Sequence, residues 1–548
     1  MDAILGEITL TRRRKKLDEM TNGGDGLGSA YTETLSRIQA QPRSRSKLGM
    51  EVLMWVSHAE RPLRVDELCH ALGVEGSTDL DIRNIPKIET LLACSLGLVV
   101  VEKSSSTIRL VHYTLQEHLS NNTNLFSNPH SIIAEVCLTY LNFPHVRGLS
   151  PTLRSVPPAV PFVEYASCYW GTHARSETTE SVKTLALRLL DGYDQHISSK
   201  LLLLQSVGAG EQPLDRDDTP RGFTGLHGAA YFGCGEIIVA LLENNKGDVW
   251  ATDFCGNVAI AWASRRGHEG VVRVLLERSN INPDTPDSDY GSAPLLWAAE
   301  NGHAGVVRIL LERSDVNPER VDRRGRTPLL LAAENGHDGI VRILLERNDV
   351  SPNKSDVFRR TPLSWASRSG HEGAVRVLLE RNDVNPNKPD RRGRTPLQFA
   401  SLKGHEGVVR MLLERSDVDP DKPDFFGQTP FSYASEDGHE GVVRILLERK
   451  DVNPDKLDLF RFTPLACASI YGHERVVMVL LERNDVNPNQ RDLFGRTPLS
   501  RASRRGHEGV VRMLLERNTV NPNQRDLLGR TPLSQASKSG HVGLWGYC

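Results

Sequence analysis

TPLLLAAENGHDGIVRILLERNDVSPNKSDVFRR, residues 327–360, is one copy of a unit that recurs to the end of the chain. The copies share the frame Thr-Pro-Leu, Ala, Gly-His, Val-Val-Arg and Leu-Leu-Glu-Arg. They open at threonines spaced 34 residues apart: Thr327, Thr361, Thr395, Thr429, Thr463, Thr497 and Thr531. A constant period of this length indicates a solenoid. Solenoids present an extended surface to another protein more often than they enclose a reaction chamber.

Each copy predicts two short helices and a turn. Thr327 caps the first helix, and the proline after it suits the first helical turn. Small alanines on its apolar face let neighbouring helices approach closely, and Gly336 ends it. His337 begins the second helix, and Asn348 is expected to close that helix in the left-handed conformation. Residues 356–360 then turn back as a hairpin-like finger.

This frame resembles the ankyrin repeat, in which a helix, a second helix and a finger follow in the same order. The frame extends back to Thr224, which gives ten units within residues 206–548, the last one incomplete. The resemblance implies a mainly α fold, a solenoid of about ten helix-turn-helix units with hairpin-like fingers. The family's Thr-Pro-Leu-His keeps its histidine only at His227, so the hydrogen bonds of that histidine are not carried over to the other copies.

The region before the array is not repetitive and divides into three segments. Residues 1–45 are polar and basic, and residues 126–205 are predicted to form a helical connector. Residues 46–125 show the order helix, helix, helix, hairpin, which is that of a winged helix. The hairpin is predicted from two β-rich runs, 98–101 and 108–112, around a short serine turn. We therefore expect a winged-helix-like α/β segment before the solenoid.

Three stretches of this region resemble the winged-helix region of fungal NACHT-ankyrin proteins, which are NLR-like signalling NTPases of the STAND class. They are residues 55–63 (WVSHAERPL), 110–118 (LVHYTLQEH) and 137–141 (CLTYL). The resemblance implies a role in self/non-self or stress sensing, with the array as the sensor. It also makes residues 1–45 the tail of a NACHT-like region.

The sequence lacks the Gly-x-x-x-x-Gly-Lys-[Ser/Thr] loop with which a NACHT domain cradles phosphates. Two explanations stay open at this point. The chain is a truncated paralogue or a fragment, as the incomplete last repeat also suggests, or it works with a partner that supplies the NTPase.

The composition of the chain limits its cellular compartment and the classes of molecule that it could bind. A formal net charge of -2 argues against a general binder of nucleic acid or anionic membranes. The sequence has no secretory apolar segment and no stretch that would span a bilayer. Its eight cysteines form no C-x-x-C pair, so free thiols in a reducing cytosol are expected. We predict a cytoplasmic protein. The nucleus is the alternative if the basic run at 12–16 is an import signal rather than a solvated helix face.

The recurring histidines and aspartates are interpreted as structural. One histidine per copy, stacked at solenoid spacing, does not converge on a metal ion. The recurring finger aspartate is a turn former rather than a catalytic carboxylate. No Ser/His/Asp or Cys/His set has a recognisable local signature. We therefore predict no catalytic activity, cofactor, metal or small-molecule substrate.

Variable positions are the candidates for binding another protein, because exposed aromatic and arginine side chains are enriched at interface hot spots. They fall at the finger tips and the ends of the first helices, which are expected to line one concave face. The predicted protein-binding residues are Arg323, Arg324, Phe358, Arg391, Arg392, Phe425, Phe426, Phe460 and Phe494 at the tips, and Arg265, Arg368, Tyr471 and Arg504 at the helix ends. The alternative for the tip phenylalanines is that each packs on the next finger.

Three functions are compatible with these features. The first is a non-catalytic scaffold or sensor that binds another protein through the concave face. The second is the regulatory part of a split NLR-like NTPase that acts with a NACHT partner. The third, a DNA-associated regulator, is disfavoured by the near-neutral chain and by a candidate recognition helix, 87–96, with few cations.

Overall fold

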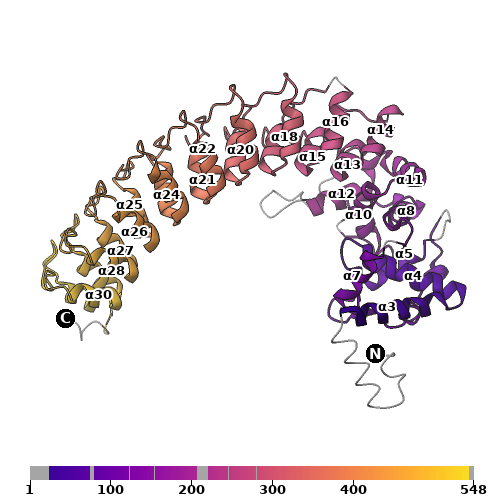
Figure 1. The fold of residues 1–548 in the computed structure, drawn as a ribbon, viewed down its shortest axis with the longest axis horizontal. Coiled ribbons are helices and arrows are strands. Elements are labelled where there is room, and N and C mark those ends of the chain that lie inside the picture. Colours follow the sequence, from indigo (N-terminus) through magenta and orange to yellow (C-terminus); the bar gives the residue numbers. More distant parts are fainter. Residues whose placement is uncertain are drawn as a thin grey trace, which may run out of the picture. The chain divides into compact units, whose positions relative to one another are not determined.

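The computed structural model describes residues 24–74, 79–122, 124–153, 155–206, 220–244, 246–278, 281–541 and 543. The basic run at 12–16 and most of the incomplete end of the last repeat lie outside these residues. The chain forms two compact units, residues 1–281 and residues 282–548, and both are drawn in Figure 1. Within the described ranges, no helix is both long and apolar enough to cross a membrane.

The first unit contains the predicted order of helix, helix, helix, hairpin. Its elements are α3 (Gly24–Gln39), α4 (Arg43–His58), α5 (Val65–Leu72), the short η1 (Ile82–Asn84), α6 (Ile88–Cys94), β1 (Val99–Glu102), β2 (Thr107–Leu110) and α7 (Tyr113–Asn121). The two strands are antiparallel, with Val101 opposite Ile108. An isolated bridge joins Arg64, just before α5, to Thr107. The hairpin is therefore tied to the helices as well as to itself.

A helical region follows in the same unit: α8 (Pro129–Leu141), α9 (Pro144–Arg147), α10 (Val163–Ser176), α11 (Glu180–Leu190), η2 (Tyr193–Gln195) and α12 (Ile197–Ser206). An aromatic core connects it to α4. Trp55 is buried, and its ring centroid lies 5.7 Å from that of Phe162 and 6.2 Å from that of Tyr165. Large buried aromatic side chains of this kind supply much of the apolar area that stabilises a core.

Two histidines in this region are buried in the neutral state. His173 of α10 is fully buried; its Nδ1 lies 2.8 Å from Nδ1 of His130 and its Nε2 lies 3.0 Å from the Tyr165 hydroxyl. The Glu60 N–H donates to the Tyr165 oxygen, which leaves the hydroxyl proton for His173. Burial lowers the pKa of His173 to about 3, and the neighbouring imidazoles of His130 and His58 lower it further.

His196, before α12, has a similar environment. Its Nε2 lies 3.1 Å from the Leu141 carbonyl oxygen, to which it donates, and its Nδ1 accepts the Ser198 N–H at 3.1 Å. With both ring nitrogens used and the side chain buried, the neutral form is favoured. Burial lowers the pKa of His196 to about 4 against the opposing effect of the Leu141 hydrogen bond.

The repeats begin in the first unit with α13 (Gly225–Phe232), α14 (Gly235–Glu243), α15 (Ala259–Arg266) and α16 (Glu269–Glu277). Helix α10 covers the start of this array. Trp170 contacts Phe232 with ring centroids 5.0 Å apart, and the Cys234 thiol donates to the Gly171 carbonyl at 3.3 Å. The first repeat of a solenoid has no preceding repeat to bury its apolar face, and α10 takes that place.

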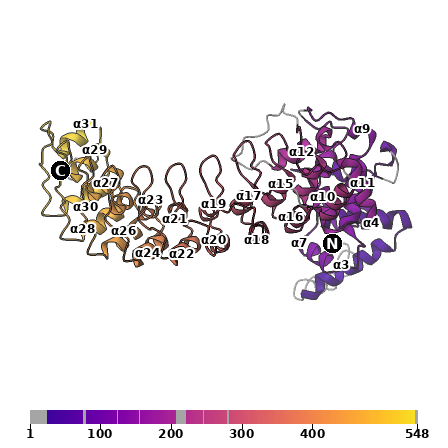
Figure 2. The same ribbon diagram turned by 90° about the horizontal axis from the view of Figure 1, so that it is seen from above.

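The second unit continues the array with one pair of helices per repeat. The helices are α17 (Pro294–Glu300), α18 (Ala304–Leu311), α19 (Pro328–Glu334), α20 (Asp338–Leu345), α21 (Pro362–Ser369), α22 (Glu372–Leu379), α23 (Pro396–Lys403), α24 (Glu406–Glu414), α25 (Pro430–Glu436), α26 (Glu440–Leu447), α27 (Pro464–Tyr471), α28 (Glu474–Leu481), α29 (Pro498–Arg505), α30 (Glu508–Leu515) and α31 (Pro532–Lys538). Figure 2 shows the loops between repeats projecting in a row on the side opposite α20, α22 and α24.

The recurring Thr-Pro and Gly-His pairs act as predicted. At the start of α25, the Thr429 hydroxyl accepts the Ser432 N–H at 3.1 Å, and Pro430 occupies the first turn. After α25, Gly438 has φ 79°, and the ring of His473 from the next repeat lies against it. His473 Nε2 donates to the Glu436 carbonyl at 2.8 Å. Each histidine of this kind therefore joins two neighbouring repeats and has a structural role.

The prediction for Asn348 is wrong. Helix α20 ends at Leu345, and Asn348 is not among the residues with positive φ. The turn is shaped instead by Arg347, which donates from Nε and Nη2 to the two oxygens of Asp349 at 2.9 and 2.7 Å and from Nη1 to the Leu311 carbonyl of the preceding repeat at 3.3 Å. A bidentate ion pair closes the loop here without a left-handed residue.

Two fingers carry an arginine where the others carry glycine. Arg359 and Arg461 have φ of 62° and 61°, close to the 74° of Gly325 at the same place in its finger. A side chain with a Cβ is strained in this region. We expect Arg461→Gly to stabilise its repeat by about 1 kcal/mol, because the strain removed exceeds the entropy that glycine adds to the unfolded chain. Hydrogen exchange of α27 would measure the gain. The control is Arg324→Gly, because φ of Arg324 is not positive, and it should not stabilise its own repeat. An equal gain in stability from this control would contradict the strain argument.

Candidate functional site

Each finger of the array is held rigid by its recurring aspartate. In the finger before α25, Oδ1 of Asp424 accepts the N–H groups of Phe426 and Gln428, both at 2.9 Å. Its Oδ2 accepts the Tyr433 hydroxyl of α25 at 2.8 Å. Burial of Tyr433 and its hydrogen bond to Asp424 raise the pKa of that phenol. The aspartate accepts these three hydrogen bonds and shapes the turn of the finger, as predicted.

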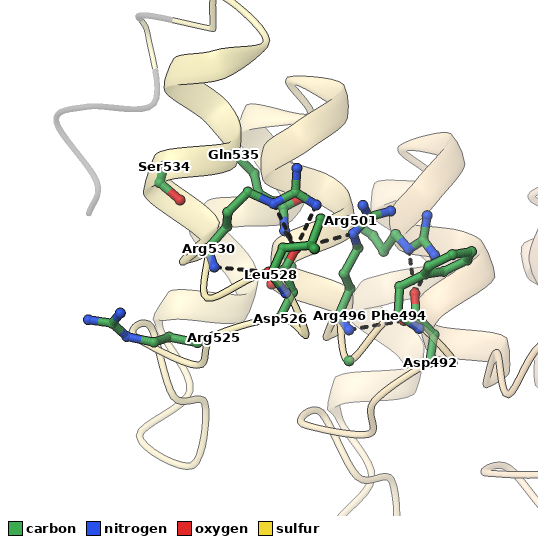
Figure 3. Close-up of polar contacts among 12 residues, drawn as sticks. Asp492, Phe494, Arg496, Arg501, Arg525, Asp526, Leu528, Arg530, Ser534 and Gln535 are labelled. Carbon is green, nitrogen blue, oxygen red and sulfur yellow. Dashed lines mark hydrogen bonds and ion pairs between the residues drawn. The ribbon is translucent and has the colours of Figure 1, made fainter.

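The residue that takes the second carboxylate oxygen differs among repeats. It is Trp365 for Asp356, Arg501 for Asp492 and Gln535 for Asp526. Figure 3 shows the last two cases, in which Asp492 lies against the Arg501 side chain and Asp526 lies near the side chains of Arg496 and Arg530. Asp526 also binds Arg530 at 2.9 Å and lies 3.6 Å from Arg496 of the preceding finger. In these terminal repeats, the finger aspartates form ion pairs with Arg496, Arg501 and Arg530.

Neighbouring fingers are joined by one backbone hydrogen bond each. The Leu459 N–H donates to the Phe426 carbonyl at 2.9 Å, and the Leu527 N–H donates to the Phe494 carbonyl at 3.0 Å. The Arg391 N–H donates to the Phe358 carbonyl at 3.0 Å. These bonds fix the tips in register, so their side chains form a row whose spacing is that of the repeats.

The tip phenylalanines are exposed. Their exposed fractions run from 47% at Phe426 to 68% at Phe425, and Phe358, Phe460 and Phe494 lie between these values. Packing on the next finger therefore covers at most part of each ring. Exposed apolar side chains in a contiguous patch, rather than singly, are typical of interaction surfaces.

The predicted arginines differ in their surroundings. Five of them are exposed: Arg323, Arg324, Arg391, Arg392 and Arg504. Arg323 also donates to the Ser288 carbonyl of the preceding finger. Arg265 lies in the first unit, half-buried, with its guanidinium 5.6 Å from the ring centroid of Trp262. Arg368 has its guanidinium 5.2 Å from the ring centroid of Trp365.

The structure brings some of the predicted residues together around hollows. One hollow is lined by Phe358, Arg368, Arg391 and Arg392, and a second one is lined by Tyr471. The remaining predicted residues line neither of the two: Arg265, Arg323, Arg324, Phe425, Phe426, Phe460, Phe494 and Arg504. The predicted set is therefore a row of tips plus a localised group of arginines.

Sequence reasoning missed Arg360 and Arg394, which also line the first hollow. Both immediately precede the capping threonine, where an arginine recurs in the array. The Arg394 guanidinium lies 4.6 Å from the Phe399 ring centroid, and that of Arg360 lies 4.4 Å from the Trp365 ring centroid. The recurrence is visible in the sequence, but the contact of each arginine with the aromatic ring of the following helix depends on the tertiary structure.

The hydrogen bonds of the family histidine are partly replaced. His227 Nδ1 accepts the Thr224 N–H, and its Nε2 lies 3.0 Å from the Asn257 carbonyl, to which it donates. Gln398 reproduces this bridge: its Oε1 accepts the Thr395 N–H at 2.6 Å, and its Nε2 donates to the Gln428 carbonyl at 2.7 Å. A glutamine amide has an acceptor and a donor at a similar separation, so it can link a helix cap to the next finger in the same way.

Four overlapping matches to the family model described as ankyrin repeats (3 copies) cover residues 280–356, 348–424, 416–492 and 484–544. Residues 280–544 are ankyrin repeats. Residues 36–129 match the model described as GPI inositol-deacylase, winged helix domain, which confirms the predicted winged-helix segment ahead of the ankyrin array. No curated protein matches the chain. Across the part of the chain that the structure describes, no group of three or more His, Cys, Asp or Glu residues is arranged to hold a metal ion.

Proposed function

We propose that this protein is a non-catalytic interaction scaffold or sensor, and that the ankyrin fingers and first-helix ends hold another protein. The observation that carries the proposal is the row of exposed, register-fixed tip phenylalanines from Phe358 to Phe494. Rigid aromatic side chains give a large contact area at little entropic cost, because the finger is already ordered before binding. The predicted domain boundaries at 45, 125 and 205 and the cytoplasmic location, with the nucleus as the alternative, belong to the same proposal.

A pull-down from fungal cell extract tests the tip row. We expect the full chain to retain partners that are lost when Phe358, Phe425, Phe426, Phe460 and Phe494 are all changed to Ser, because five exposed aromatic anchors are removed. The control variant changes five exposed second-helix residues to Ser: Arg342, Arg376, Arg410, Arg444 and Met478. The ion pairs that this control removes lie at the surface and contribute little to the stability of the parent chain.

Circular dichroism on both variants separates lost binding from lost fold. Equal capture by the tip variant and the parent chain, with both folded, would remove the tip row as the binding surface. Capture lost only by the control variant would move the site to the second helices.

The winged-helix match favours a second candidate, the regulatory part of a split NLR-like NTPase that acts with a NACHT partner. We would measure nucleotide hydrolysis by a NACHT-domain protein that co-purifies with the chain, with and without the chain. An unchanged rate would count against this function. DNA binding has less support, because the only charged side chain of α6 is Glu89 and a recognition helix needs cations to contact phosphates.

A further inference from the structure

Two adjoining hollows lie among the finger and first-helix residues of the second unit. The first has a volume of about 370 Å³ and is lined from the finger before α21 to the end of α23. The second has a volume of about 500 Å³ and is lined by the ends of α23, α25 and α27. Both include Leu402 and Lys403, so they form one continuous groove.

The first hollow is strongly cationic. Of the residues that the structure describes, Asp390 is its only negatively charged lining residue. Its positively charged lining residues are Arg360, Arg368, Arg391, Arg392, Arg394 and Lys403. Asp390 is buried, and its oxygens already accept the N–H groups of Arg392 and Arg394 and the Arg394 guanidinium. Among the described residues, the side chains of Arg368, Arg391, Arg392 and Lys403 have no carboxylate partner. The hollow therefore carries uncompensated positive charge.

Arg360 is held there without a hydrogen bond for its Nε. That atom is buried and has no hydrogen-bond partner in the described structure. In the equivalent finger position, Arg394 Nε donates to Asp390 at 3.1 Å. Trp365 donates to the Asp356 carboxylate oxygen at 3.2 Å, and Arg360 Nε stays 3.7 Å from that oxygen, in an ion pair without a hydrogen bond. Its guanidinium instead lies between two rings, with centroids 4.6 Å away at Phe358 and 4.4 Å away at Trp365.

The crowding of cations around Arg360 is unfavourable in the free protein. Burial lowers the pKa of Arg360, and the guanidiniums of Arg368 and Arg394 lower it further against the opposing Asp356 and Asp390. An anion entering the hollow would relieve this repulsion. Guanidinium groups also match the geometry of a carboxylate, which they bind with two parallel hydrogen bonds.

The second hollow has a net negative lining. Its carboxylates are Glu436 and Asp437 at the end of α25, and they outnumber its one lysine, Lys403, which is shared with the first hollow. The exposed ring of Tyr471 also lines it. Gln428 Nε2 donates to Glu436 at 2.7 Å, which orients that carboxylate without neutralising it. The groove thus changes from positive to negative over the step from one repeat to the next.

We propose that this groove binds an extended segment of a partner protein that places an acidic side chain in the first hollow and a basic side chain in the second. The proposal rests on the interaction function proposed above and specifies its ligand chemistry. The cations belong to α21, α23 and the fingers before them, and the carboxylates lie at the end of α25, which is about one to two helix spacings away. Packed helices lie about 8–10 Å apart, and an extended chain covers one to two such spacings in about three to six residues. The two charged residues of the partner are therefore about three to six positions apart.

Selection of random peptides displayed on phage by the immobilised full chain tests this ligand. We expect enriched peptides to carry Asp or Glu with Lys or Arg about three to six positions away. Their binding should fall roughly tenfold or more for the double variant Arg368→Glu and Arg392→Glu, because both residues line the first hollow but not the second and both changes place negative charge beside the acidic side chain. The matched control is Arg376→Glu with Arg410→Glu, which makes the same charge change on the exposed sides of α22 and α24.

The outcomes separate this proposal from the interaction function itself. Enriched peptides without an acidic residue, no enrichment, or equal loss in both double variants would overturn the groove ligand. The tip-row pull-down would be unaffected by any of these results. Equal capture of partners by the parent chain and the tip variant would instead exclude the tip row as the binding surface. The peptide selection alone would then test the groove.

Discussion

Acidification from pH 7 to pH 5 is expected to destabilise the helical region of the first unit by about 4 kcal/mol, as about 2 kcal/mol from each of His173 and His196. The pKa of His173 is about 3 and that of His196 about 4 in the folded chain, against 6.5 ordinarily. Below pH 6.5, His173 and His196 become protonated in the unfolded chain but stay neutral in the folded chain. The stability is therefore present above pH 6.5 and is lost as the pH falls towards 4 and 3.

Hydrogen exchange of α10 and α12 at pH 7 and pH 5, corrected for intrinsic exchange, would measure this loss. His173→Gln and His196→Gln are the controls, because glutamine cannot take up a proton in this range. Each variant should lose about half of the pH dependence, even if it is less stable at pH 7. Protection of α10 that stays the same between the two pH values would contradict the buried neutral histidines.

Replacing Gly438 by Ala is expected to cost the array about 3 kcal/mol, part from strain at positive φ and part from overlap. Gly438 has φ 79°, and a Cβ there would lie 2.5 Å from Nδ1 of His473. The ring cannot move aside freely, because its Nε2 donates to the Glu436 carbonyl. Urea unfolding followed by circular dichroism would measure the loss of stability. The repeats before and after α25 should then unfold at different urea concentrations.

Two further variants divide this cost. Gly540→Ala places the same change at φ 80°, where no atom of the described residues, its chain neighbours aside, lies within 4 Å of the added Cβ, so it should show the backbone strain alone. Gly438→Ala combined with His473→Ala should be less destabilised than the sum of the single changes, because the overlap is gone. Strict additivity would mean that the glycine is required for its conformation only.

The periodic part of the fold was predictable because its signals act within a few residues. Thr429 caps the helix that begins at the next residue, and Gly438 ends it, so both roles are written in the local sequence. The failure at Asn348 has the same origin. Asparagine tolerates the left-handed region, but the loop conformation is decided by the pair of Arg347 and Asp349 and by the Leu311 carbonyl of another repeat.

By itself the sequence determined the solenoid, its helix caps, the winged-helix order and the row of finger tips, because period and capping are local properties. Only the tertiary structure decided which charges are left without a close partner. Trp365 makes the hydrogen bond to Asp356, and Arg360 is left with an ion pair of 3.7 Å while it lines a groove with cations from two neighbouring repeats. The contact of His130 with His173 likewise joins residues 43 positions apart. Such outcomes depend on which side chains meet across helices, and no local pattern encodes those contacts.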